Sequence, residues 1–149
     1  MVYGTRAFQL AMLVVYESPL QVLCDTPYAY RQSPEGLDFL KLVPTSWDET
    51  RVINGQVGDY ITVARRSGED WYIAAMTDWT ERSLRIPLTC LKEGRFSAEI
   101  WQDADPKKDN LLVKSSRNVT AQDTLKADLH SGGGYLVRLT PNPVPLPNP

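Results

Sequence analysis

The chain has 149 residues, about the length of one average domain, which allows a single modest hydrophobic core. Sixteen basic residues against eighteen acidic ones give a net charge of −2, with one histidine and no basic block. This balance argues against a nucleic-acid partner, because proteins of that class present a strongly basic surface. Two cysteines, Cys24 and Cys90, lack metal-ligand spacing, and the sequence leaves open one disulfide or two unrelated thiols.

The first elements in the chain have a helical pattern. Thr5 is placed to cap a helix, and residues 7–16 are apolar on every side except at Gln9. A helix of this kind has to be covered all round. The apolar run after Arg6 imitates a signal peptide, but no small-residue cleavage site follows it. The run is also too short to span a membrane, so no membrane partner is expected.

A second helix follows a short interruption. Pro19 breaks the first helix, and the apolar residues 19–25 are ambiguous between strand and helix. Ser33 is predicted to cap a new helix that has Pro34 at its first position and ends before Pro44.

From about Trp47 the pattern changes to short strands with polar turns. Residues 59–66 and 70–77 flank a compact turn and predict a hairpin whose strands are buried on both faces. Further strands are predicted where apolar and polar residues alternate, at 83–88, 95–101, 124–129 and 134–139. Regularly spaced short strands predict an antiparallel β-sandwich. The tail from residue 141 has proline at every second position and is expected to be extended and disordered.

Several ordered motifs resemble the C-terminal end of glycoside hydrolase family 97, a family of α-glucosidases and α-galactosidases. They are "GTRAFQLA", "ESPLQVLCD", "WDETRVINGQVGDYITVARR", "WYIAAMTDW" and "GGGY", and together they run from about residue 4 to 139. The order of the motifs makes the resemblance far more specific than any one of them.

The resemblance implies a mixed fold. Residues 1–47 would be the C-terminal end of a (β/α)8 TIM-barrel catalytic domain, 48–140 a C-terminal antiparallel β-sandwich, and 141–149 a disordered proline-rich tail. It also implies periplasmic or secreted hydrolysis of α-linked oligosaccharides, aided by calcium. The motifs that carry the family's catalytic and calcium residues lie upstream, so no catalytic or metal residue is assigned here. The chain alone is expected to be an inactive fragment of a glycosidase.

Two candidate substrate-binding residues lie near the end of the helical part. If residues 19–25 are the last barrel strand, Asp25 lies at its C-terminal end, the face on which barrel enzymes keep their active sites. Tyr28 follows in the same loop and would line a sugar pocket. The alternative is that Asp25 is a turn residue before Pro27.

Trp101 is the third candidate substrate-binding residue. It alternates with the inward-facing Ile100, so it is expected on the outer face of its strand as a platform for stacking sugars. Trp71, in contrast, lies in a strand that is expected to be buried, where core packing is the default. A sugar platform would make the chain a freestanding carbohydrate-binding module. The alternative to a glycosidase fragment is therefore a freestanding β-sandwich module, either carbohydrate-binding or structural.

The adjacent acids Asp48 and Glu49 suggest sugar chemistry at first sight. A glycosidase needs two carboxyl groups that flank one bond, and neighbouring residues of an extended segment point to opposite faces. The favoured interpretation is a structural pairing with Arg51, Arg65 or Arg66 at the junction between the two parts.

Two polar stretches are interpreted as turns. Residues 103–110, "DADPKKDN", hold three carboxylates but lack the glycine and the final glutamate of a calcium-binding EF-hand, so a solvated hairpin loop is expected. His130 and the glycine run after Ser131 have no helix context for phosphate binding and predict a tight turn between strands.

Overall fold

The computed structural model describes residues 4–18, 26–104 and 111–142. Three helices lie within these ranges: α1 (Arg6–Val15), α2 (Pro27–Arg31) and α3 (Pro34–Leu40). The strands that follow them are β1 (Glu49–Gln56), β2 (Tyr60–Ser67), β3 (Asp70–Thr77), β4 (Arg82–Pro87), β5 (Phe96–Asp103), β6 (Leu112–Val119), β7 (Thr124–Leu129) and β8 (Gly134–Pro141). No helix in the described part is long and apolar enough to cross a membrane.

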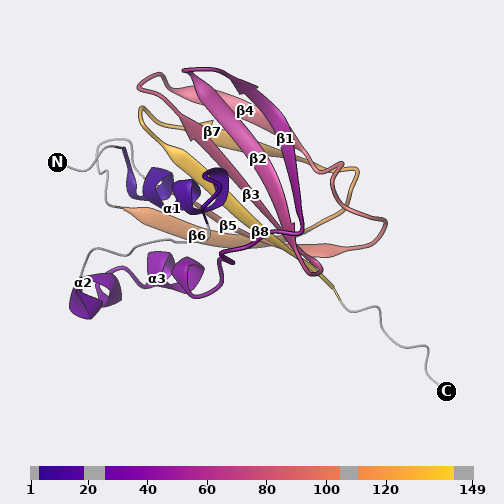
Figure 1. Cartoon of the computed structure of the whole chain (residues 1–149), viewed down its shortest axis with the longest axis horizontal. Coiled ribbons are helices and arrows are strands. Elements are labelled where there is room, and N and C mark those ends of the chain that lie inside the picture. The colour runs from indigo at the N-terminus through magenta and orange to yellow at the C-terminus, as the bar shows by residue number, and fades with distance from the viewer. Residues whose placement is uncertain (1–3, 19–25, 105–110, 143–149) are drawn as a thin grey trace.

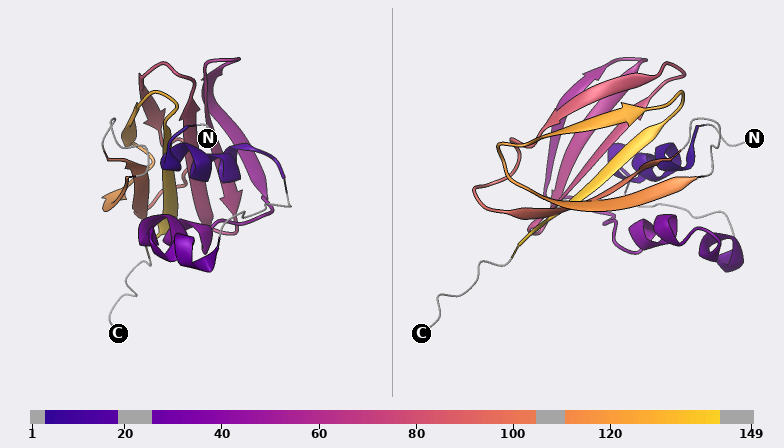
Figure 2. Two further views of the ribbon diagram at one scale, coloured as in Figure 1. Left: turned by 90° about the vertical axis from the view of Figure 1, so that its left-hand side faces the viewer. Right: turned by 180° about the vertical axis from the view of Figure 1, so that it is seen from behind.

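The strands form two antiparallel sheets that pack face to face. The larger sheet has the order β1-β2-β3-β8-β5-β6, and the smaller one pairs β4 with β7. The side chains between the two sheets form the main core, with Ile73, Ile86 and Val137 among its fully buried members. The predicted antiparallel β-sandwich is therefore confirmed (Figures 1 and 2).

The opposite face of the larger sheet is covered by helices (Figure 1). Helix α1 lies across β3 and β8, and α3 lies beside it near β6. Leu10 and Val14 of α1 pack with Ala74 and Leu136 of the sheet in a second core. The helices thus form a third layer, and the sheet is buried from both sides at its centre.

Burial on both faces explains the sequence of the central strands. Every residue of β3 after Asp70 is buried, because its side chains alternate between the sandwich core and α1. The predicted hairpin joins β2 to β3, with Gly68 at a positive φ of 61° in the turn. The alternation predicted for β4 and β5 is also confirmed, since Ile86 and Ala98 point into the main core.

The helical layer is attached to the sheet by a buried carboxylate. Asp103, the last residue of β5, is only 9% exposed. Its carboxylate accepts hydrogen bonds from the Thr5 hydroxyl at 2.7 Å, the Ala7 backbone N–H at 3.3 Å and the Gly134 backbone N–H at 3.4 Å. One side chain therefore joins the N-terminus of α1 to two neighbouring strands, β5 and β8. The loss of hydration on burial raises the pKa of Asp103 above its ordinary value, because it outweighs the hydrogen bonds, which lower that pKa.

Close packing of backbones completes this junction. A Cβ atom at Gly134 would lie 2.5 Å from the backbone carbonyl of Ala7, so only glycine allows α1 to approach β8 so closely. The Thr5 backbone N–H also donates to the Gly132 carbonyl, at 2.9 Å. The glycine run is thus the predicted turn between strands, and it is also the surface on which α1 rests.

Several sequence expectations need correction. The stretch 103–110 was expected to be a solvated loop, but Asp103 is buried in a strand because it satisfies the end of α1; residues 105–110 lie outside the described residues. The tail was expected to begin at residue 141, yet Pro141 ends β8 and the Asn142 N–H donates to the Arg95 carbonyl. Residues 143–149 lie outside the described part.

Two further differences concern local signals. Strands β1 and β6 were not predicted. No residue of β1 is buried and six of the eight residues of β6 are exposed, so neither strand shows a clear alternation. Ser33 does occupy the capping position of α3, with Pro34 following, but its hydroxyl makes no capping hydrogen bond. The helix is held instead by its packing through Phe39.

The structure describes the state of one of the two cysteines. Cys90 is a buried free thiol, and burial raises its pKa to about 11. A thiol of this kind is unreactive at neutral pH. Cys24 lies outside the described residues.

We predict that Asp103→Asn lowers the free energy of unfolding at pH 7 by about 1–3 kcal/mol, because an amide cannot accept all three hydrogen bonds. The raised pKa means that the folded state of the wild type binds the proton more tightly than the unfolded state. The stability that Asp103 contributes therefore falls as pH rises above about 3.8 toward the raised value, and Asp103→Asn removes this slope. Urea unfolding between pH 4 and 7 measures both effects. Asp123→Asn is the control: the pKa of Asp123 is lowered by its Thr120 hydrogen bonds, so the stability that it contributes is lost only as pH falls below about 3.8, and the slope of this variant between pH 4 and 7 matches that of the wild type. A slope of Asp103→Asn equal to that of these two proteins would contradict the assignment.

We predict that Gly134→Ala lowers the free energy of unfolding by about 1–3 kcal/mol, because the added methyl pushes α1 away from β8. Gly36→Ala in α3 is the matched control: its Cβ would meet nothing closer than 3.4 Å, and alanine favours the helix by about 0.5–1 kcal/mol. Chemical denaturation of the two variants gives the comparison. A Gly134→Ala protein as stable as Gly36→Ala would show that α1 does not rest on this residue.

Candidate functional site

The three residues predicted to bind substrate do not come together. Asp25 lies outside the described residues. Tyr28 stands on α2 with 73% of its surface exposed, and its role in binding sugar stays a prediction. Trp101 faces away from the sandwich core as predicted, but it is completely buried.

The burial of Trp101 corrects the idea of an exposed sugar platform. The indole N–H donates to the Glu35 carbonyl of α3 at 2.9 Å, and the ring meets Phe39 edge-on with centroids 5.2 Å apart. The Lys114 ammonium lies 4.9 Å from the ring centroid. The side chain points outward from its strand, but the helical layer covers that face. Trp101 therefore anchors α3 to the sheet and has no free face for a sugar.

The acids at the predicted junction form ion pairs, as expected. Asp48 lies 3.3 Å from Arg66, and Glu49 bridges Arg51 at 2.6 Å and Arg66 at 3.3 Å. The hydrogen bond from Arg51 is the largest cause that lowers the pKa of Glu49. Asp48 also accepts the Gly68 N–H of the β2–β3 turn. These carboxylates tie the start of β1 to the neighbouring hairpin and are not free for catalysis.

Arg65 takes a different role from its neighbour Arg66. It is buried, and its guanidinium donates to the Val15 carbonyl at the C-terminal end of α1, at 3.1 Å. It also lies over the Trp47 ring, 5.8 Å from the centroid. Successive side chains of β2 point to opposite faces of the sheet, so Arg65 faces the helices and Arg66 does not.

A second group of charges crosses the helix-covered face. Arg138 of β8 pairs with Asp70 at 2.7 Å and with Glu99 at 3.4 Å, and Glu99 pairs with Lys114 at 2.9 Å. Each of these acids has a cationic partner, so this cluster is structural as well. Among the described residues, no group of three or more His, Cys, Asp or Glu side chains is arranged to hold a metal ion.

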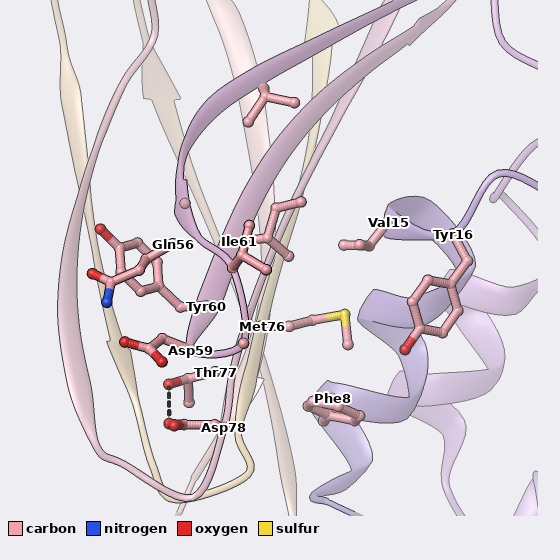
Figure 3. A pocket seen from close by; sticks show the side chains of 14 residues that line it. Phe8, Val15, Tyr16, Gln56, Asp59, Tyr60, Ile61, Met76, Thr77 and Asp78 are labelled. Atoms are coloured by element: carbon pink, nitrogen blue, oxygen red, sulfur yellow. Dashed lines mark hydrogen bonds between the residues drawn. The ribbon is translucent and has the colours of Figure 1, made fainter.

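The described part of the chain does contain a large apolar groove between α1 and the β1–β2 hairpin, which we call the α1–hairpin groove. It has a volume of about 540 Å³. Figure 3 shows Phe8, Val15 and Tyr16 on one side of the groove, from α1 and its C-terminal cap, and Ile61 of β2 and Met76 of β3 on the other. Val57, in the turn of the hairpin, also lines the groove. The sequence reasoning missed this groove, because its two walls are more than thirty residues apart in the chain.

The polar end of the groove is held by one arginine. Asp59, Thr77 and Asp78 lie there, and Figure 3 shows the hydrogen bond between Thr77 and Asp78. Arg82 forms ion pairs with Asp78 and, at 3.6 Å, with Asp59. The hydrogen bond from Arg82 is the main cause that lowers the pKa of Asp78. Both carboxylates are therefore occupied by an internal partner.

This geometry defines the class of protein as a β-sandwich domain with a helical covering layer and an apolar groove beside α1. The family model of the glycosyl-hydrolase 97 C-terminal domain, described as an oligomerisation domain, matches residues 46–140. The chain belongs to this family, which confirms the resemblance that its motifs indicate.

The relatives of the chain are glycoside hydrolases. A retaining alpha-galactosidase of Bacteroides thetaiotaomicron is 36% identical over 144 residues, which cover 91% of this chain and 21% of the relative. A probable retaining alpha-galactosidase of Streptomyces bingchenggensis is 32% identical, covering 89% of this chain and 20% of the relative.

Solved structures agree with these relatives. A family 97 enzyme of Pseudoalteromonas sp. strain K8, solved in complex with acarbose and as an E480Q variant with panose, matches with a TM-score of 0.88 and 36% identity. The match covers 93% of this chain and 23% of that enzyme. The chain thus spans about a fifth of the length of its curated relatives and corresponds to a C-terminal portion.

We predict that Trp101→Ala lowers the free energy of unfolding by about 3–5 kcal/mol, because it empties a fully buried site beneath α3. Trp79→Ala is the matched control: Trp79 is 64% exposed, and a smaller loss of stability is expected. Denaturation curves give the stabilities, and isothermal titration with malto-oligosaccharides tests binding. Sugar binding by the wild type that Trp101→Ala abolishes without loss of stability would restore the platform hypothesis.

Proposed function

We propose that this chain is the C-terminal domain of a longer family 97 α-glycosidase that hydrolyses α-glycosidic bonds in oligosaccharides. The observation that carries the proposal is the family match over residues 46–140, together with relatives that are about five times as long as the matched region. Both curated relatives are named as alpha-galactosidases, so an α-galactoside is the favoured substrate.

The ion pairing of the acids supports a non-catalytic role for the domain itself. Glycoside hydrolysis needs two carboxyl groups about 5–9.5 Å apart across a sugar, and one of them must carry a proton. The exposed acids described above are held as ionised partners of arginines. Asp103 is buried beneath α1 and does not line the α1–hairpin groove. In this proposal the catalytic residues lie in the preceding portion of the longer protein.

The helical residues 1–47 would then be the last elements of the catalytic barrel, and residues 48–140 the sandwich. The way that α1 and α3 cover the sheet supports this arrangement, because a barrel presents helices on its outside. The sandwich would stabilise the barrel by burying two of those helices. Calcium and a periplasmic or secreted location belong to the same proposal, with the calcium ligands in the preceding portion.

The rival hypothesis is a freestanding carbohydrate-binding or structural β-sandwich module. Binding of malto-oligosaccharides or α-galactosides by the isolated chain, measured by isothermal titration, would favour the binding form of this hypothesis. A longer protein that lacks any glycosidase activity would favour the structural form.

We predict that the full-length protein hydrolyses 4-nitrophenyl α-galactoside or α-glucoside, and that the 149-residue chain does not. The physical reason is that the carboxylates at the start of β1 and in the α1–hairpin groove are held as ionised partners of arginines, so they do not supply the protonated and ionised pair that hydrolysis needs. Release of nitrophenol by equal molar amounts of the two proteins is the measurement. Clear turnover by the 149-residue chain would overturn the proposal.

A further inference from the structure

Three of the seven large apolar side chains that are exposed in the described part of the chain line the α1–hairpin groove. Tyr16 is 56% exposed and Val52 is 66% exposed, and both line the groove. Val57 lines it too and is fully exposed. Large apolar residues on the surface are ordinary when they are scattered, but several around one hollow mark an interaction site.

Val57 is an unusual residue for its position. It lies in the turn between β1 and β2, beside Gly58, which has a positive φ of 87°. Such turns favour glycine, asparagine, aspartate and serine, and a valine in solvent stabilises nothing within the chain. Its place at the edge of an apolar groove is explained if another surface covers it.

The groove lies where the helical layer stops before the sheet does. Helix α3 lies beside α1 near β6, and α1 crosses β8 and β3. The sheet continues beyond α1 through β2 to β1. Ile61 of β2 and Met76 of β3 point to the helical side there, and they form the floor of the groove beside α1 (Figure 3). The open position is therefore the next place in a row of helices that already contains α3 and α1.

The polar groups of the groove do not favour a sugar as its occupant. A carbohydrate site needs free hydrogen-bonding groups that fix the hydroxyls of the ligand. Asp78 accepts from Arg82 and from the Thr80 N–H at 2.8 Å, and Asp59 is paired with Arg82. Apart from Gln56 and the hydroxyls of Tyr16 and Tyr60, the remaining walls are apolar, as the contact surface of an amphipathic helix requires.

We propose that the α1–hairpin groove seats an apolar face of an α-helix from the portion of the longer protein that precedes this chain. This inference rests on the proposed function, because the relatives are about five times as long as the matched region, and the family description places that region at the C-terminal end. The incoming helix packs beside α1, at the usual interhelical distance of about 8–10 Å, and over Ile61 and Met76. The tip of the β1–β2 hairpin, with Val57, closes over its other side.

The test is the accessibility of Val57 in the full-length protein, in a Cys24→Ser background. Val57→Cys and Val113→Cys are labelled with a maleimide; Val113 is an exposed valine of β6 that lies away from the groove. Cys90 is buried and adds little background. If the proposed helix occupies the groove, Val57→Cys in the full-length protein reacts with the maleimide at least about tenfold more slowly than Val113→Cys. In the isolated 149-residue chain, Val57→Cys reacts at least as fast as Val113→Cys.

Equal labelling of the two cysteines in the full-length protein would overturn the proposal, since the groove would then be open. The proposal would also be overturned if the protection of Val57→Cys disappears when the protein is diluted and if the Val57→Asp variant has the mass of a monomer. These two results together would identify a second copy of the protein as the occupant of the groove. If the isolated chain is insoluble, the comparison within the full-length protein decides alone. Glycosidase activity of the full-length protein is a separate measurement, because it tests the proposed function and not the docked helix. If Val57→Cys is protected in a full-length protein that shows no glycosidase turnover, the proposed function is rejected and the docked helix is retained.

Discussion

The contact of α1 with the start of β8 is the constraint on which the rest of the structure depends. Asp103 holds the N-terminus of α1 through Thr5 and Ala7, and Gly134 lets the two backbones meet. Without this junction the second face of the larger sheet would lose its cover. The apolar residues that central strands direct to that face would then contact water, and their burial would no longer stabilise the fold.

This three-layer arrangement accounts for the character of the domain. One face of the large sheet is sealed by β4 and β7, and the other is partly sealed by helices. The charged groups between these layers are paired with one another and stabilise the junctions without forming a reaction centre. An apolar groove lies open beside α1. In our proposal this groove packs against a helix of the longer protein, while the family to which the domain belongs is described by its C-terminal position and by oligomerisation.

Local patterns predicted much of the fold. Alternation predicted β4 and β7, because a strand with one buried face shows its period directly. Strands β5 and β8 were predicted as well, although both of their faces carry buried residues. The pairing of Asp48 and Glu49 with neighbouring arginines followed from the rule that charges at a junction are normally paired. Strands β1 and β6 escaped, since edge strands with mostly exposed residues show no such period. Of the site, Trp101 was placed on the correct side of its strand and assigned the wrong environment.

The sequence by itself determined the family, the sandwich and the direction of the residues in the strands that it predicted, since these depend on ordered motifs and on periods of two. Only the tertiary structure decided which outward faces are covered. Trp101 and Asp103 are buried because helices from the other end of the chain lie over them, and the groove exists because that cover ends at α1. Contacts between residues almost a hundred positions apart leave no local period, and a single sequence does not reveal them.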